Sequence, residues 1–201
     1  MKIKAIEAIC KQHKHIRLYN TGRQQWISAG SAAYPINFLP AMNEDYLLAI
    51  LDVPEDKRSK YFVEFGDTLP AAYSFFDTAV GETLLEQYPI EVSVYGGIVV
   101  PLVTSLGMVF INKDYLKPFK DIKRGVDLYE RINDAGELYI AVKDGFMLCG
   151  LILPLDIINK EFSDSLCKLA ELTRVSFENK KTNERDGQIN ITEVLELDEE
   201  Q

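Results

Sequence analysis

The sequence has few of the residues with which proteins build metal and redox sites. It contains three cysteines, two histidines and one tryptophan among 201 residues. A zinc site needs several closely spaced cysteine, histidine or carboxylate ligands, and the only such cluster is Cys10, His13 and His15. A helix that ends near His13 would not present all three side chains on one face. We therefore expect no metal site.

Motifs of nucleophilic catalysis and of phosphate binding are also missing. No G-x-S-x-G turn is present. Gly96-Gly97 lies between two strand-like runs and is not followed by Lys-Ser or Lys-Thr, which predicts a hairpin rather than a phosphate-binding loop. Cys10 falls on an apolar stripe, as expected for an unreactive core thiol. We expect no catalytic residue and no cofactor.

Long hydrophobic runs are absent as well. No apolar run approaches the roughly 20 residues needed to cross a bilayer. The basic start of the chain is not followed by an apolar segment, because Glu7, Lys11 and Lys14 interrupt it, so no secretory signal is expected. An odd number of cysteines in apolar surroundings is typical of thiols kept reduced. These features predict a cytoplasmic protein.

The strongest structural signal lies in residues 126–179. Two runs, 126–132 and 137–143, alternate apolar and polar side chains, and 146–153 is apolar on both faces, which predicts a strand covered on each side. Asp144-Gly145 predicts a type I′ hairpin turn. An amphipathic helix follows from residue 159 or 163 to about residue 178, with Phe162, Leu166, Leu169 and Leu172 as its apolar stripe.

Weaker patterns organise the rest of the chain. Helices are predicted over residues 2–12 and 44–51. Residues 15–20 and 23–29 predict a hairpin. Residues 30–40 contain two prolines and predict an edge strand or a loop, and residues 66–88 predict a long loop that carries several aromatic rings.

Together these patterns predict an α+β fold. The sheet should be mostly antiparallel, with about seven to nine strands and the C-terminal amphipathic helix packed on it. Composition becomes polar after residue 178, so we expect one globular domain over residues 1–178. Residues 179–201 should form a polar, acidic C-terminal tail.

Charge is unevenly distributed, although the net charge is −9. Residues 1–25 carry +5 and residues 101–125 carry +3, whereas residues 26–100 carry −8. An acidic chain is disfavoured as a general duplex-DNA binder. If the fold brings the basic segments 2–17 and 113–124 together, they predict a local nucleic-acid patch, whose candidate residues are Lys11, Lys14, Arg17, Lys117, Lys120, Lys123 and Arg124.

Carboxylates gather near the predicted long loop. Two of them could converge in a cleft and separate their pKa values, as in acid–base catalysis. An enzyme with an acidic cleft in residues 66–91 is therefore one of the alternatives, with Asp67, Asp77, Glu82 and Glu86 as the carboxylates concerned.

Apolar residues interrupt the acidic tail and predict a short element that docks on the body of the protein or on a partner. The candidate partner-binding residues are Ile191, Val194, Leu195 and Leu197. Because the chain lacks recognisable chemistry, the leading hypothesis is a non-enzymatic protein that acts through protein–protein contacts, with an unidentified partner or a second copy of itself. The nucleic-acid protein and the acidic-cleft enzyme remain the alternatives.

Short motifs resemble stretches of uncharacterised accessory proteins of phages and mobile elements of gut bacteria: Val94-Tyr95-Gly96-Gly97, Leu128-Tyr129-Glu130-Arg131 and Gly150-Leu151-Ile152-Leu153-Pro154. The similarity covers most of residues 15–178. It implies an accessory role in a bacterial cytoplasm and assigns no activity and no catalytic residue.

Overall fold

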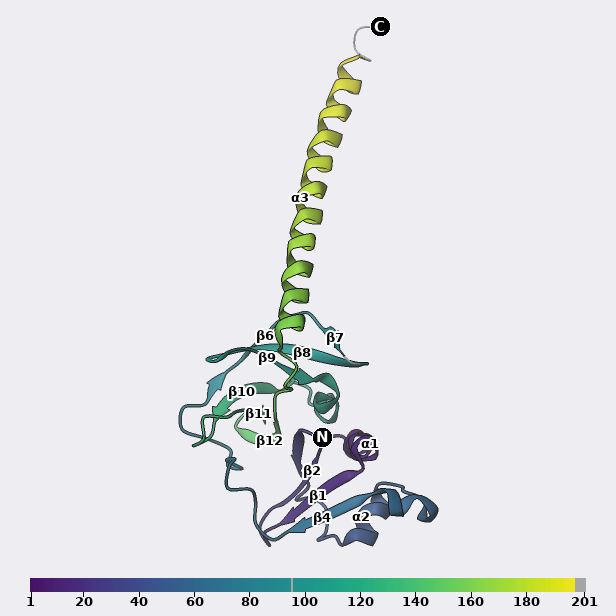
Figure 1. Cartoon of the computed structure of the whole chain (residues 1–201), viewed down its shortest axis with the longest axis vertical. Helices are drawn as coiled ribbons and strands as arrows, with labels where there is room; N and C mark the ends of the chain where they lie inside the picture. The colour runs from purple at the N-terminus through teal and green to yellow at the C-terminus, as the bar shows by residue number, and fades with distance from the viewer. Residues whose placement is uncertain (95, 198–201) are drawn as a thin grey trace. The chain divides into compact units, whose positions relative to one another are not determined.

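The computed structural model describes residues 1–94 and 96–197, with side chains as far as residue 181. The chain separates into two units, Met1–Asp156 and Ile157–Gln201. The first unit holds all the strands described below, and the second holds one long helix. Figure 1 shows the order of these elements along the chain.

In its described residues the first unit contains two α-helices, two 3₁₀ helices and twelve strands. In chain order the elements are α1 (Ile3–His13), β1 (His15–Asn20), β2 (Gln25–Ala29), β3 (Ala32–Pro35), α2 (Glu44–Ile50), η1 (Glu55–Lys60), β4 (Phe62–Gly66), β5 (Thr83–Leu84), β6 (Glu86–Gln87), β7 (Val92–Val94), β8 (Gly97–Thr104), β9 (Gly107–Asn112), η2 (Lys113–Phe119), β10 (Asp127–Ile132), β11 (Leu138–Asp144) and β12 (Met147–Ile152).

The strands form two sheets. The larger has eight strands in the order β4-β1-β2-β3-β12-β11-β10-β5, and every pair in it is antiparallel except β1 with β4. In the smaller sheet β8 pairs with β6, β7 and β9. The predicted α+β class with a mostly antiparallel sheet is confirmed.

Alternation along the strands gives the large sheet two buried faces. Ile16 and Leu18 of β1 point into the main core, which also takes residues from α1, α2 and the smaller sheet. A second, smaller core lies on the opposite face under the loop of residues 67–82. That second core contains Trp26, Phe75, Tyr139, Ala141, Leu148 and Leu151.

The prediction of an edge strand or loop in residues 30–40 is wrong in part. β3 lies inside the sheet, between β2 and β12. Pro35, which cannot donate a ladder hydrogen bond, is the last residue of the strand. The interior position depends on pairing with β12, far along the chain, which local sequence cannot reveal.

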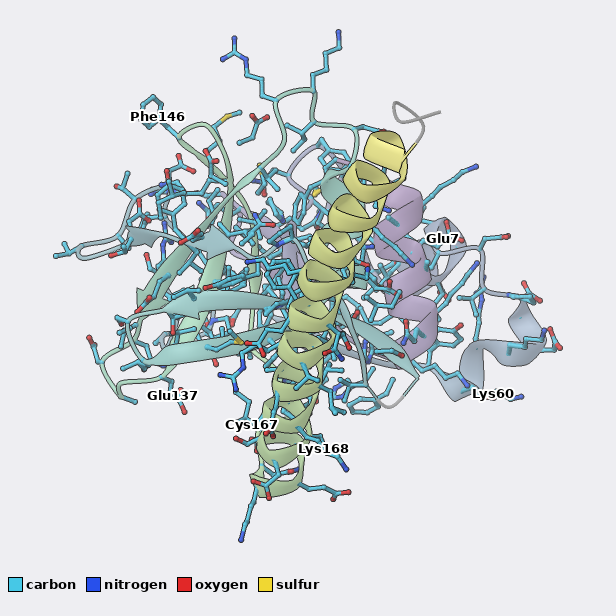
Figure 2. The ribbon with its side chains drawn as sticks, turned by 90° about the horizontal axis from the view of Figure 1, so that it is seen from above. Glu7, Lys60, Glu137, Phe146, Cys167 and Lys168 are labelled. Carbon is cyan, nitrogen blue, oxygen red and sulfur yellow. The ribbon has the colours of Figure 1, made fainter. Side chains whose placement is uncertain are left out.

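The β11–β12 hairpin forms as predicted, but its turn lies one residue further on. Asp144 pairs with Met147, so Gly145 and Phe146 are the central residues. Gly145 has a φ of 59°, and glycine at the first central position is typical of a type II′ turn rather than type I′. Phe146 is 86% exposed at the tip of this hairpin (Figure 2).

The second unit is formed by α3 (Lys160–Leu197). Asn159, one of the two predicted starting positions, caps the helix, since its side chain accepts a hydrogen bond from the Phe162 amide. The helix continues past residue 178, where the change in composition had suggested the end of the domain. No proline interrupts that stretch, so the backbone can propagate the helix.

Candidate functional site

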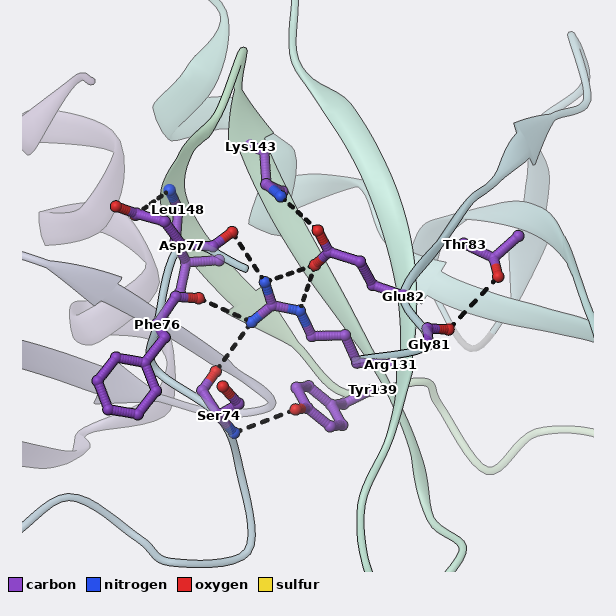
Figure 3. Close-up of polar contacts among 10 residues, drawn as sticks. All are labelled: Ser74, Phe76, Asp77, Gly81, Glu82, Thr83, Arg131, Tyr139, Lys143 and Leu148. Atoms are coloured by element: carbon purple, nitrogen blue, oxygen red, sulfur yellow. Dashed lines mark hydrogen bonds and ion pairs between the residues drawn. The ribbon is translucent and has the colours of Figure 1, made fainter. Parts of the chain in front are cut away.

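The carboxylate of Glu82 lies in a buried ion cluster with Arg131 and Lys143 (Figure 3). Its Oε2 is 2.7 Å from an Nη of Arg131, and its Oε1 is 2.6 Å from Nζ of Lys143. The side chains of Arg131 and Lys143 are 1% and 4% exposed, and that of Glu82 is 14% exposed. The two cations come from neighbouring strands, β10 and β11, while Glu82 ends the 67–82 loop.

Arg131 also binds the backbone of that loop. Its guanidinium donates two hydrogen bonds to Glu82 and three to the carbonyl oxygens of Ser74, Phe76 and Asp77. These five bonds match the number of N–H donors that a guanidinium has. Arg131 therefore fixes four positions of the loop on the sheet.

Burial alone would raise the pKa of Glu82, but the hydrogen bonds and positive charges of Lys143 and Arg131 outweigh it and lower the pKa. The carboxylate is consequently ionised at neutral pH. A carboxyl whose pKa is lower in the folded than in the unfolded protein adds stability above its unfolded pKa, and that stability is lost as the pH falls through the folded pKa. The charge of Glu82 thus serves as counter-ion for two buried cations.

The other loop carboxylates named as candidates have different positions. Asp77 accepts the amide hydrogen of Leu148 in β12 through Oδ1, at 2.9 Å. Asp67 is exposed, and Glu86 is exposed on the short strand β6. Glu82 and Asp77 thus have structural partners, and the 67–82 loop is attached to three consecutive strands, β10, β11 and β12. The Tyr139 hydroxyl adds a further attachment, since it accepts the Ser74 amide hydrogen at 3.0 Å.

Beside this attached loop lies a groove on the same face of the large sheet. Its apolar end has a volume of about 200 Å³. It is lined mainly by small, aliphatic and aromatic residues, which come from β1, from β3, from β12 and the residue after it, and from the loop; they are Tyr19, Ala32, Ala33, Pro70, Tyr73, Phe75, Leu151 and Leu153. The ion cluster keeps the loop on the sheet, and the loop supplies Pro70, Tyr73 and Phe75 as one wall.

A polar hollow of about 240 Å³ adjoins this groove, since Arg17, Ser28 and Gly30 line both. His13 and His15 complete its lining together with Ala29. Arg17 points to this face because β1 alternates, with Ile16 and Leu18 directed into the core. The Arg17 Nε donates to Glu64 Oε2 at 2.5 Å, across the parallel β1–β4 pair.

Gly30 allows the wall of the polar hollow to close tightly. It has a φ of 60°, and a Cβ there would lie 2.4 Å from the Tyr115 hydroxyl and 2.5 Å from Nε2 of His13. Those two atoms are themselves 3.1 Å apart and joined by a hydrogen bond. Burial lowers the pKa of His13, which favours the neutral ring.

The two basic segments meet, as the nucleic-acid hypothesis requires. The Lys2 amide donates to the Pro118 carbonyl at 2.7 Å, and Lys2 pairs with Asp121. At the other end of α1, His13 contacts Tyr115. α1 and η2 therefore lie side by side in opposite directions.

Three of the seven predicted basic residues are paired with acids: Lys11 with Glu7, Arg17 with Glu64, and Lys117 with Asp114. The other four are exposed and form no ion pair with the residues that the structure describes; they are Lys14, Lys120, Lys123 and Arg124. The patch is thus divided. Lys14 and Arg17 lie near the C-terminal end of α1. Residues 120–124 follow η2 and lie near the N-terminal end of α1.

Cys10 does not join His13 and His15 at the surface. Its side chain is 1% exposed in the main core, and burial raises the pKa of its thiol to about 12, with Glu7 adding to the shift. Within residues 1–94 and 96–181, no group of three or more histidine, cysteine or acidic side chains is placed to hold a metal ion. Cys10, Cys149 and Cys167 are free thiols.

In α3 the predicted apolar stripe is exposed in part: Leu169 and Leu172 are 61% and 55% exposed, whereas Phe162 and Leu166 are half-buried. Phe177, which the prediction did not include, is 57% exposed. Cys167 and Lys168 also project from this helix (Figure 2). The predicted partner-binding residues lie in the last two turns of the helix, where the side chains are outside the described residues: Ile191, Val194, Leu195 and Leu197.

Fold and site together define an α+β protein with a groove of mixed polarity and a long amphipathic helix whose apolar stripe is partly exposed. In comparisons with protein-family models, curated proteins and solved structures, nothing matches the chain. No helix in the described part of the chain is both long and apolar enough to span a membrane.

Proposed function

We propose that this is a non-enzymatic cytoplasmic accessory protein that acts through protein–protein contacts, and that α3 makes the contact with α3 of a second copy. The observation that carries the proposal is the exposed apolar stripe of α3. Three free cysteines support a reducing compartment.

The stripe has the geometry of a helix–helix contact surface. At about 100° per residue, Leu166, Leu169, Leu172 and Phe177 fall within about 140° of the helix circumference. Ser165, Thr173 and Ser176 lie in the same arc, and the Thr173 and Ser176 hydroxyls bond to carbonyl oxygens of their own helix. An apolar stripe of this width is normally buried against another element. The side chains of Leu169, Leu172 and Phe177 are each more than half exposed, so they are available to a partner.

Charge along the helix favours a second copy in the opposite direction. Residues 160–165 carry a net −1, whereas residues 174–181 carry a net +2. An antiparallel pair that crosses near residue 170 places the acidic start of one helix beside the basic middle segment of the other, residues 174–181. It also opposes the two helix dipoles, which is favourable.

Replacing Leu169 with aspartate should weaken self-association by at least about 100-fold, because each copy would lose a buried leucine and would place a carboxylate in the contact. Sedimentation equilibrium of the full chain at several protein concentrations measures the change. Far-UV circular dichroism verifies that α3 stays helical.

Val175→Asp is the matched control. Val175 is an exposed apolar residue of the same helix, 45% exposed, but it lies about 120° away from Leu169 around the axis. It introduces the same charge and should leave self-association nearly unchanged. A wild-type chain that stays monomeric, or two variants that dissociate equally, would contradict the assignment of the stripe.

The contact between α1 and η2 favours a second candidate function, binding of single-stranded nucleic acid. Lys120, Lys123 and Arg124 are exposed near the start of α1, where Lys4 is also exposed. Four cations close together can neutralise successive phosphates. The net charge of −9 opposes such binding at a distance, so the patch would work at short range.

Changing Lys120, Lys123 and Arg124 together to glutamine should reduce the salt dependence of oligonucleotide binding by a slope of about 2, since each lost phosphate contact removes about 0.7. Fluorescence anisotropy with a labelled single strand from about 50 mM salt upward measures it. Lys57→Gln with Lys60→Gln in η1 is the control, because these lysines are exposed outside the patch. Absence of wild-type binding at the lowest salt would exclude this function.

A further inference from the structure

The apolar end of the groove beside the 67–82 loop suits a hydrocarbon group rather than a nucleobase. Ala33 and Leu151, which face each other across the β3–β12 pair, and the rings of Tyr73 and Phe75 surround it. A base that entered would bury several polar edges with few hydrogen-bonding groups to match them, at a cost for each unpaired group. A volume of about 200 Å³ accommodates one aromatic ring or a branched aliphatic group.

The polar end places one fixed cation next to that apolar space. The Arg17 Nε donates a hydrogen bond to Glu64. Glu64 lies on β4, which pairs with one edge of β1, whereas β2 and β3 lie on the other side of β1. Glu64 therefore orients the guanidinium through Nε, and Arg17 lines both the apolar and the polar part of the groove. A single guanidinium edge matches the two oxygens of one carboxylate, and Ser28 supplies a hydroxyl close by.

We propose that this groove is a binding site for a small monocarboxylate with an aromatic or branched apolar tail. The carboxylate binds Arg17 with help from Ser28, and the tail lies between Tyr73, Phe75 and Leu151. Glu64 is a positioning residue that holds Arg17. The site is independent of α3 and of the proposed self-association.

The only tryptophan of the chain provides a direct readout. Trp26 packs against the edge of Phe75, with ring centroids 4.9 Å apart, and pairs across the strands with Tyr19. A ligand that contacts Phe75 and Tyr19 should change its emission. Titration of the full chain with 3-phenylpropionate should give a saturable change with a Kd of about 1 mM or tighter. The uncharged 3-phenylpropionamide should bind at least about 10-fold more weakly.

Two variants test the two ends of the groove. Arg17→Gln removes the cation at an exposed position and should weaken binding of the acid by about 10- to 100-fold while leaving the amide unchanged. Ala33→Leu fills the apolar end and should abolish binding of both compounds. Arg23→Gln, an exposed arginine in the β1–β2 turn, should bind like the wild type.

Several results would overturn the proposal. They are no saturable change with the acid, equal binding of acid and amide, or unaltered binding by Arg17→Gln. A change caused by adenosine monophosphate or inorganic phosphate, but not by 3-phenylpropionate, would reassign the groove to phosphate ligands. None of these results bears on the oligomeric state, so failure here and failure of the proposed α3 contact are distinguishable.

Discussion

Replacing Arg131 with methionine should lower the free energy of unfolding by about 3–5 kcal/mol, the usual cost of removing one partner from a buried ion pair. The substitution leaves Lys143 and Glu82 in a cluster with one cation fewer. It also leaves the carbonyl oxygens of Ser74 and Phe76 without their guanidinium donor. Denaturant unfolding at neutral pH measures the loss.

The same variant should release the 67–82 loop before the rest of the protein unfolds. Amide hydrogen exchange in this loop should become faster, while exchange in β11 changes less at low denaturant. Arg124→Met is the matched control, because Arg124 is exposed and has no ion pair with any described residue. It should change stability by less than about 0.5 kcal/mol. If Arg131→Met were equally mild, the cluster would not hold the loop.

Replacing Ile140 with alanine should lower the free energy of unfolding by about 2–5 kcal/mol. The substitution leaves a cavity, and the strands on both sides of β11 prevent the surrounding side chains from closing it. Ile140 has no exposed surface and lies in β11, between β10 and β12, in the main core. Chemical denaturation with an unchanged m-value is the expected result.

Ile132→Ala provides the comparison for this substitution. Ile132 ends β10 and is 48% exposed, so the same truncation should cost about 1 kcal/mol or less. Similar losses at both positions would show that β11 is not at the centre of the packed core.

Local patterns in the sequence were sufficient for the strands that pair with their neighbours in the chain. The run from β10 to β12 and the β1–β2 hairpin depend on alternation and on turn residues a few positions apart, and both form. The helices at residues 2–12 and 44–51 are confirmed within one residue, as α1 and α2. The start of the amphipathic helix α3 was likewise predicted from the spacing of its apolar residues.

The sites depended on contacts that the sequence does not encode locally. Arg131 and Lys143 meet Glu82 from 49 and 61 residues away, and only pairing of β10 with β11 brings the two cations to one face. The sequence did contain a signal for a buried ion cluster. Arg131 lies on the same face of β10 as Tyr129, and Lys143 on the same face of β11 as Tyr139. In a sheet covered on both sides, a cation on such a face is buried and needs a counter-ion.

The groove could not be predicted for the same reason. Its walls come from β1, β3, β12 and the 67–82 loop, segments that become neighbours only in the finished sheet. The aromatic residues Tyr73 and Phe75 are evident in the sequence, but Arg17, the cation proposed to bind the carboxylate, is more than 50 positions earlier.

The position of β3 also has a consequence for biosynthesis. Ala33 pairs with Leu151, more than a hundred residues later, so a ribosome must translate most of the first unit before this strand finds its second neighbour. Until then the early hairpin exposes a row of unpaired amide and carbonyl groups, which other chains can capture. Long-range pairing of this kind slows folding, and a nascent chain of this protein should therefore benefit from chaperone protection until β12 emerges.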